Sequence, residues 1–155
     1  MLHIRRLTLF ALLSGLLTSG IASAGTLQFE GAWVPEAPPV APVLGGYVQI
    51  SNTGDKDVII TAAESPDFAS VEIHDMQMHD GMMRMIKQDK LIIPAGGQVE
   101  LKQGSFHLML MKPKRTFKQG DTLEVTFTMA DGQSDTVRFE VKPREMHDEH
   151  QHQHH

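Results

Sequence analysis

The sequence contains no cysteine among its 155 residues. This absence excludes disulfide bonds, redox-active thiols and every metal centre that depends on thiolate sulfur, blue-copper and dinuclear thiolate copper centres included. Basic residues are also in the minority, since 14 Lys and Arg stand against 19 Asp and Glu. An acidic chain with scattered cations lacks the basic patch that nucleic-acid binding requires, so nucleic acid is excluded as a partner.

Long apolar runs are absent after the first two dozen residues. The one apolar stretch, residues 7–17, follows Arg5 and Arg6 and precedes Ala22-Ser23-Ala24, which is the order of a secretory signal peptide. This stretch is too short to span a bilayer. We therefore predict a signal peptide over residues 1–24, cleavage after Ala24, and a mature chain outside the cytoplasm without a membrane span. The arginine pair is compatible with either general or twin-arginine export.

The mature chain is long enough for one domain with a single core. Its short segments alternate apolar and polar residues and are separated by Gly, Pro, Asn and Asp, with no helical periodicity. This pattern, with about seven to nine strands, predicts an all-β domain over residues 25–143, an antiparallel β-sandwich or barrel. The predicted strands span residues 26–34, 46–51, 58–63, 70–74, 91–93, 98–102, 106–111, 123–129 and 136–141.

One predicted strand carries unusual chemistry. In His107-Leu108-Met109-Leu110-Met111 the side chains alternate, so the histidine and both methionines share one face while the leucines point to the core. A second segment, residues 74–85, adds further imidazoles and thioethers. They are His74, Met76, Met78, His79, Met82, Met83 and Met85. Thioether sulfur with imidazole nitrogen, and no thiolate, is a ligand set that suits Cu(I).

Four of these residues can form one site. His74 and Met85 lie on either side of Asp80-Gly81 and can come from the two sides of a hairpin, while His107 and Met109 come from another strand. Two nitrogens and two sulfurs satisfy the tetrahedral preference of a closed-shell soft ion. The alternative is that the methionines fill a core, as we expect for Met129, or form an adaptable protein-binding surface.

The C-terminal segment, residues 144–155, is polar and low in complexity, which predicts a disordered tail. Five of the nine residues from 147 to 155 are histidine, interrupted by Asp, Glu and Gln, whereas an engineered tag is normally an unbroken histidine run. Imidazoles with carboxylates suit Cu(II), with Zn(II) and Ni(II) as alternatives. The predicted secondary metal ligands are Met146, His147, His150, His152, His154 and His155.

These residues resemble the PCu(A)C periplasmic copper chaperones, whose signature is His, ten residues, Met, twenty-one residues, His, one residue, Met. His74, Met85, His107 and Met109 match it without a gap. The resemblance extends over about residues 26–142. It implies a cupredoxin-like β-sandwich, a Cu(I) site made by those four residues, and delivery of copper toward the Cu(A) centre of cytochrome c oxidase. The implied acceptor is subunit II of the oxidase or an assembly thiol protein.

The leading hypothesis is therefore a monomeric, non-enzymatic copper chaperone. A copper-scavenging or copper-tolerance protein without a dedicated oxidase partner is the alternative. A small copper oxidase or monooxygenase needs redox cycling and an open substrate position, and thioether ligands instead favour Cu(I). An adhesion or interaction sandwich, whose methionines contact a partner protein, has no copper affinity.

Overall fold

The computed structural model describes residues 26–144, and within this range every regular element is a β-strand. The strands are β1 (Leu27–Pro35), β2 (Val43–Asn52), β3 (Val58–Glu64), β4 (Phe68–His79), β5 (Met82–Gln88), β6 (Leu91–Ile93), β7 (Gln98–Leu101), β8 (His107–Pro113), β9 (Thr122–Met129) and β10 (Ser134–Lys142). Over the same residues no helix is long and apolar enough to cross a membrane. The all-β prediction is confirmed, while the predicted signal peptide and tail lie outside the described residues.

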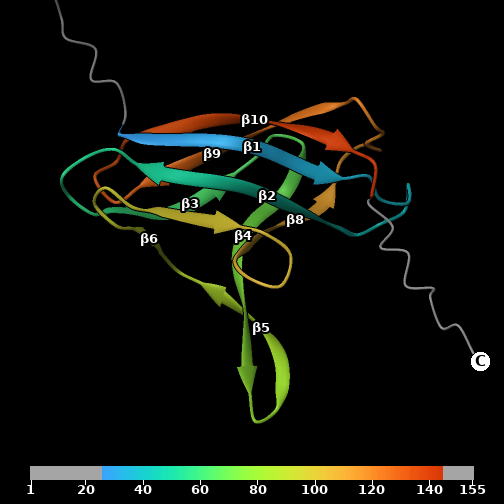
Figure 1. Cartoon of the computed structure of the whole chain (residues 1–155). Helices are drawn as coiled ribbons and strands as arrows, with labels where there is room; N and C mark the ends of the chain where they lie inside the picture. The colour runs from blue at the N-terminus through green and yellow to red at the C-terminus, as the bar shows by residue number, and fades with distance from the viewer. Residues whose placement is uncertain (1–25, 145–155) are drawn as a thin grey trace, which may run out of the picture.

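The strands pair in the order β5-β4-β8-β2-β1-β10-β9-β3-β6, and β7 pairs with β2 next to β8. An additional pairing of β3 with β4, through Ala63 and Val71, joins the two strands that lie next to the ends of this path. The strands therefore wrap around a common interior in two layers (Figure 1). Nearly all pairings are antiparallel, as predicted. The exception is β1 with β10, which run parallel. A parallel pair needs a long connection, and here the connection between the first and the last strand is the rest of the domain.

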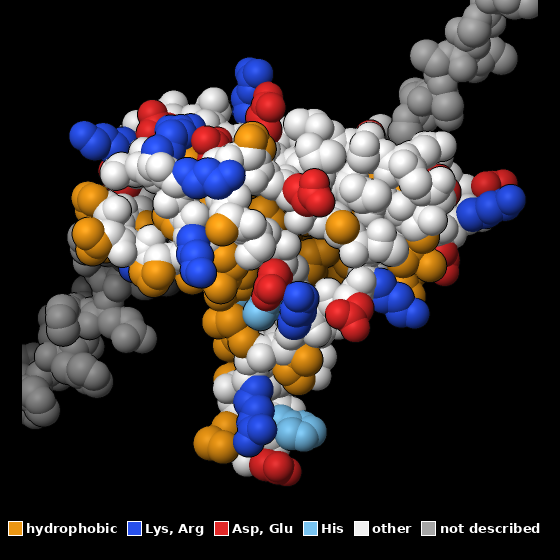
Figure 2. All heavy atoms as spheres, turned by 180° about the vertical axis from the view of Figure 1, so that it is seen from behind, with side chains coloured by type: hydrophobic (Ala, Val, Ile, Leu, Met, Phe, Trp, Pro, Cys, Tyr) orange, Lys and Arg blue, Asp and Glu red, His pale blue; other side chains and the backbone are white. Residues whose placement is uncertain are grey.

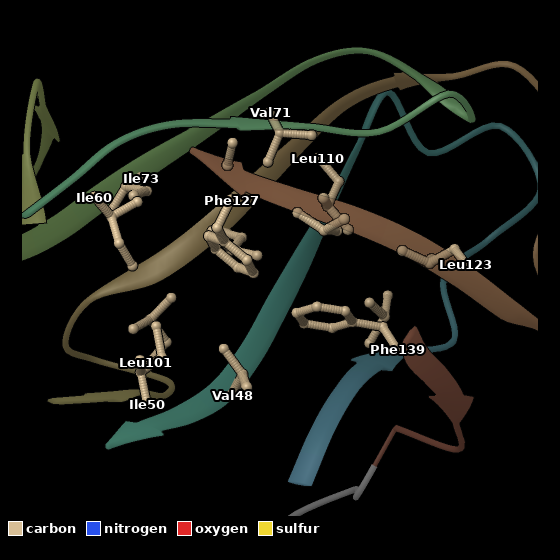
Figure 3. Close-up of a cluster of buried hydrophobic side chains, with 14 of the residues drawn as sticks. Val48, Ile50, Ile60, Val71, Ile73, Leu101, Leu110, Leu123, Phe127 and Phe139 are labelled. Carbon is tan, nitrogen blue, oxygen red and sulfur yellow. The ribbon is translucent and has the colours of Figure 1, made fainter. Parts of the chain in front are cut away.

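The core lies between the layers and follows the predicted alternation. Along β2 and β9 every second side chain is buried. Figure 3 shows Val48 of β2 with Phe127 of β9 and Phe139 of β10 among the buried side chains. Phe127 is fully buried and stacks on Phe29 of β1 with ring centroids 5.1 Å apart. Met129 is 7% exposed, which confirms its predicted core position.

One hairpin leaves the sandwich. We predicted that the fourth strand ends at His74, but β4 continues to His79 and β5 returns beside it. Asp80 and Gly81 connect the two strands with φ values of 49° and 75°, the left-handed conformations of a two-residue type I′ turn. We call residues 75–87 the arm; it extends away from the sandwich (Figure 1). Its strands lack the apolar alternation of a core strand, which is why the sequence pattern did not predict its length.

Candidate metal centre

His74 and His107 meet where the arm joins the sandwich. They are directly opposite each other in the antiparallel pairing of β4 with β8. Residues directly opposite in such a pair project to the same face of the sheet, and the two imidazole centroids are 6.0 Å apart. The neighbouring core-facing residues, Ile73 and Leu108, are buried and fix the two strands at this level. Two residues that are 33 positions apart in the sequence thus present their rings to one another.

His107 has one ring nitrogen bound and the other free. The residue is 6% exposed, and its Nδ1 lies 2.9 Å from the backbone oxygen of Ser105. A carbonyl oxygen only accepts hydrogen bonds, so Nδ1–H is the donor and Nε2 keeps its lone pair. This hydrogen bond fixes both the tautomer and the ring orientation, as is usual for a metal-binding histidine.

His74 is held in the complementary way. Its Nε2 lies 2.8 Å from a carboxylate oxygen of Glu72, and the other oxygen of Glu72 accepts a 3.1 Å bond from Lys87 Nζ. These hydrogen bonds, first from His74 and then from Lys87, lower the pKa of Glu72 below its ordinary value of 4.5. With Nε2–H donating to Glu72, the lone pair of Nδ1 is available, and this buried atom has no hydrogen-bond partner. A carboxylate that orients a histidine with one free nitrogen is the usual support of a metal ligand.

The two methionines of the predicted site lie on the same face, on either side of the histidine pair. Met109 is two residues along β8 from His107, opposite Glu72, and is half-buried. Met85 of β5 is opposite Met76, which places it two residues toward the tip of the arm from His74, and it is 52% exposed. Each step of two residues spans about 7 Å. The structure thus brings the histidines together directly and places the methionines as their flanking neighbours.

Three residues of this face were not predicted as part of the site. Glu72 and Lys87 support His74, and Met76 lies beside it, half-buried. The spacing of Glu72, His74 and Met76 by two residues was the available signal, because it places all three on one face of a strand. Within residues 26–144 no three or more His, Cys, Asp and Glu side chains are grouped so that they could hold a metal ion. The predicted tail ligands lie outside the described residues.

An open cleft of about 600 Å³ lies over β1, β2 and β7, and none of the four predicted ligands lines it. Trp33 and Tyr47 form its aromatic wall, with ring centroids 5.2 Å apart. The hydroxyl of Tyr47 would lie 2.9 Å from a Cβ atom at Gly45, and Gly45 pairs with Met109. The glycine therefore makes room for the tyrosine ring to fold over the strand next to Met109.

A family model described as "Putative lipoprotein LpqE-like" matches residues 27–141, which include nearly all of the described strands. The "Putative lipoprotein Lxx21020" of Leifsonia xyli subsp. xyli is 29% identical over 150 residues, covering 90% of this chain and 89% of that protein. The "Uncharacterized protein RP573" of Rickettsia prowazekii is 30% identical over 96 residues, covering 61% of this chain and 53% of that protein.

Solved structures share the fold. The solution structure of apo-DR1885 from Deinococcus radiodurans is 28% identical with a TM-score of 0.62, covering 94% of this chain and 98% of that one. Its Cu(I) form is 27% identical with a TM-score of 0.58, covering 78% and 79% of the two chains. A copper-bound PCuAC domain from PmoF2 reaches a TM-score of 0.65 at 19% identity, covering 77% of this chain and 94% of that one, and shows the fold alone.

Proposed function

The chain belongs to the LpqE-like family and has the fold of the PCuAC domains, and on that premise we propose that it is a periplasmic copper chaperone and not an enzyme. The observation that carries this proposal is the pair of oriented imidazoles, each with one nitrogen free, on a face that also bears thioethers. The copper-bound relatives support the same reading, since DR1885 is similar to this chain over most of its length and was solved with Cu(I).

We propose that His74, Met85, His107 and Met109 bind Cu(I). His74 contributes Nδ1 and His107 contributes Nε2, the two nitrogens left without hydrogen bonds by Glu72 and Ser105. Met109 comes from the rigid strand β8 and Met85 from the exposed arm. All four ligands are neutral, so the bound Cu(I) keeps its positive charge, which the carboxylate of Glu72 partly offsets through His74.

Release of copper follows from the different exposure of the ligands. Met85 is half-exposed while His107 is buried, so an approaching acceptor meets Met85 first. Replacement of this thioether by an acceptor ligand begins the transfer, and the remaining ligands exchange in turn without a change in the oxidation state of copper. The thioether sulfur of methionine is not protonated near neutral pH, so replacing it as a ligand needs no proton transfer.

We propose that the acceptor is the Cu(A) centre in subunit II of cytochrome c oxidase or an assembly thiol protein that serves it. Stoichiometric transfer of Cu(I) from the loaded protein to an isolated Cu(A) domain, followed by the absorption of that centre, tests this step. Stable retention of copper in the presence of the apo-domain and of reduced thiol proteins would instead favour the scavenging or copper-tolerance alternative.

The histidine-rich tail is proposed as a Cu(II) site, formed by Met146, His147, His150, His152, His154 and His155. Truncation after Arg144 leaves every described strand intact. We expect the truncated protein to lose Cu(II) binding and to keep its Cu(I) affinity. Unchanged Cu(II) stoichiometry after truncation would contradict the tail assignment, and preference of the tail for Zn(II) or Ni(II) in competition would reassign its metal.

The central test is an anaerobic Cu(I) titration against a competing chelator, with X-ray absorption to count sulfur and nitrogen neighbours. Met109→Leu keeps the size of the side chain and removes the sulfur, so we expect weaker Cu(I) binding and one fewer sulfur neighbour. Met111→Leu is the matched control, because Met111 is half-buried on the same strand and face but lies opposite Ser70, farther from the histidines. Equal affinities for both variants would contradict the proposed site.

A further inference from the structure

The arm carries two methionine pairs on one face. The pairing of β4 with β5 places Met76 opposite Met85 and Met78 opposite Met83. Because side chains alternate along β4, these four thioethers continue the face of His74 toward the tip of the arm. The opposite face carries Asp75 opposite Ile86 and Gln77 opposite Arg84, and only one of the arm's five methionines, Met82, lies there.

The geometry of the turn brings the members of each pair close together. In a two-residue hairpin the pair that flanks the turn, His79 and Met82, is the hydrogen-bonded one. Hydrogen-bonded and non-hydrogen-bonded pairs alternate from there, so both methionine pairs are of the non-hydrogen-bonded kind, with Cα atoms about 4.5 Å apart. The two pairs are separated by about 7 Å along the strands. Methionine has three rotatable side-chain bonds, so four sulfurs at this spacing can converge on one ion.

Burial in a core does not account for three of these four methionines. Met78, Met83 and Met85 are 65%, 49% and 52% exposed, respectively. Figure 2 shows the arm from behind, standing clear of the sandwich and bearing hydrophobic side chains along its length. Thioethers exposed in this way are open to oxidation outside the cytoplasm, and they do not stabilise the fold by burial. These four donors are all neutral sulfur atoms, and such a donor set is selective for soft monovalent ions.

We propose that Met76, Met78, Met83 and Met85 form a second metal site, made only of thioethers, that binds Cu(I) or Ag(I). This inference goes beyond the proposed histidine–methionine centre, because binding on the arm requires neither histidine. The two sites share Met85, so an ion held on the arm moves to the centre by exchange. Its bonds to Met76, Met78 and Met83 break as bonds to His74, His107 and Met109 form, with no electron or proton transferred. The exposed end of the arm is then the entry point for the metal.

The test uses Ag(I), a redox-inert soft ion, and the full chain with isotope-labelled methionine methyl groups. Each methyl signal in the NMR spectrum reports on its own sulfur atom. The His74→Ala/His107→Ala variant removes the nitrogen ligands, and in it we expect Ag(I) to shift the signals of Met76, Met78, Met83 and Met85. The signals of the buried Met129 and of Met82, which is exposed on the opposite face of the arm, should not move.

The matched substitutions are Met78→Leu/Met83→Leu and Met82→Leu, each placed in the double-histidine variant. We expect the first to lower the bound Ag(I) by one equivalent and the second to leave it unchanged. Equal binding in both, or shifts of Met78 and Met83 no larger than that of Met82, would overturn the arm site and leave a protein-binding surface as its explanation. Failure of the histidine–methionine centre has a different signature, namely an unchanged Cu(I) affinity when the histidines alone are replaced.

Discussion

The sandwich and the arm are both built from paired β-strands, but the side chains of the sandwich are buried on one face whereas most of those of the arm are exposed. In β9 the residues Leu123, Val125 and Phe127 are buried. In β5 every residue except Gln88 is exposed, although it pairs in regular register with β4. Strand β4 belongs to both regions, since Ile73 points to the core and Asp75, two residues later, does not reach it. His74 lies between them. The difference indicates that burial determines the residue type in the sandwich, whereas burial does not account for the exposed methionines of the arm, for which we propose metal binding.

The largest effect that separates the two regions is on stability. Phe127→Ala removes a fully buried ring and should lower the free energy of unfolding by about 3–5 kcal/mol. Met83→Ala, in the exposed arm, should change it by no more than about 0.5 kcal/mol. Urea unfolding of the metal-free protein measures both. A cost for Met83→Ala that approaches that of Phe127→Ala would show that the arm packs against the sandwich.

The second effect is on copper affinity and acts at the junction of the two regions. Glu72→Gln replaces the carboxylate that orients His74, and substitution of such supporting groups lowers metal affinity by about 10–100-fold. A Cu(I) competition titration measures the loss. Glu100→Gln is the matched control, because Glu100 also pairs with a lysine, Lys102, at 3.1 Å but lies on the cleft side. If both variants keep wild-type affinity, Glu72 does not support a metal ligand.

These differences also explain how much was predictable from the sequence. Strands β6, β9 and β10 follow from apolar alternation between turn residues, and the buried leucines of β8 confirm the predicted core face. Strand β5 could not be predicted in this way because neither of its faces is covered. The parallel neighbour of β1 could not be predicted either, since the pairing of Val34 with Val141 depends on the closure of the whole sandwich and not on any local pattern.

The sequence predicted the types of ligand in the candidate site, but not the residues that orient these ligands through hydrogen bonds. The alternation in residues 107–111 and the spacing of His74 and Met85 pointed to one face with imidazoles and thioethers. The two-residue spacing of Glu72 and His74 places both on one strand face, but glutamate and lysine occur on most protein surfaces, so this spacing alone did not assign a role to Glu72 or Lys87. Only the register that places Lys87 opposite His74 reveals their role.

A third prediction compares the same substitution in the two regions. Gly81 and Gly132 are turn glycines with φ values of 75° and 86°, in the arm and in the β9–β10 hairpin, respectively. Alanine at a positive φ costs about 1 kcal/mol. Gly132→Ala should lower the global free energy of unfolding by this amount. Gly81→Ala should instead raise the amide hydrogen exchange of the arm and leave the urea midpoint unchanged. A loss of global stability in Gly81→Ala would mean that the arm and the sandwich unfold as one unit.

The smallest predicted effect concerns pH at the junction. Hydrogen bonds from His74 and Lys87 lower the pKa of Glu72 in the folded protein below its ordinary value of 4.5. Glu72 therefore contributes stability that is present above pH 4.5 and is lost as the pH falls through its lower folded pKa. Its side chain is 28% exposed, so this contribution lies within the range of about 0–1 kcal/mol for solvent-accessible ion pairs.

The measurement is the difference in unfolding free energy between the metal-free wild type and Glu72→Gln, followed from pH 7 downward. The wild type should be the more stable protein near neutrality, and the difference should disappear in acid, where the carboxyl group is protonated and resembles the amide. A difference that stays constant below the folded pKa would assign the effect to packing. The carboxylate would then have no electrostatic part in holding His74 at the boundary between the sandwich and the arm.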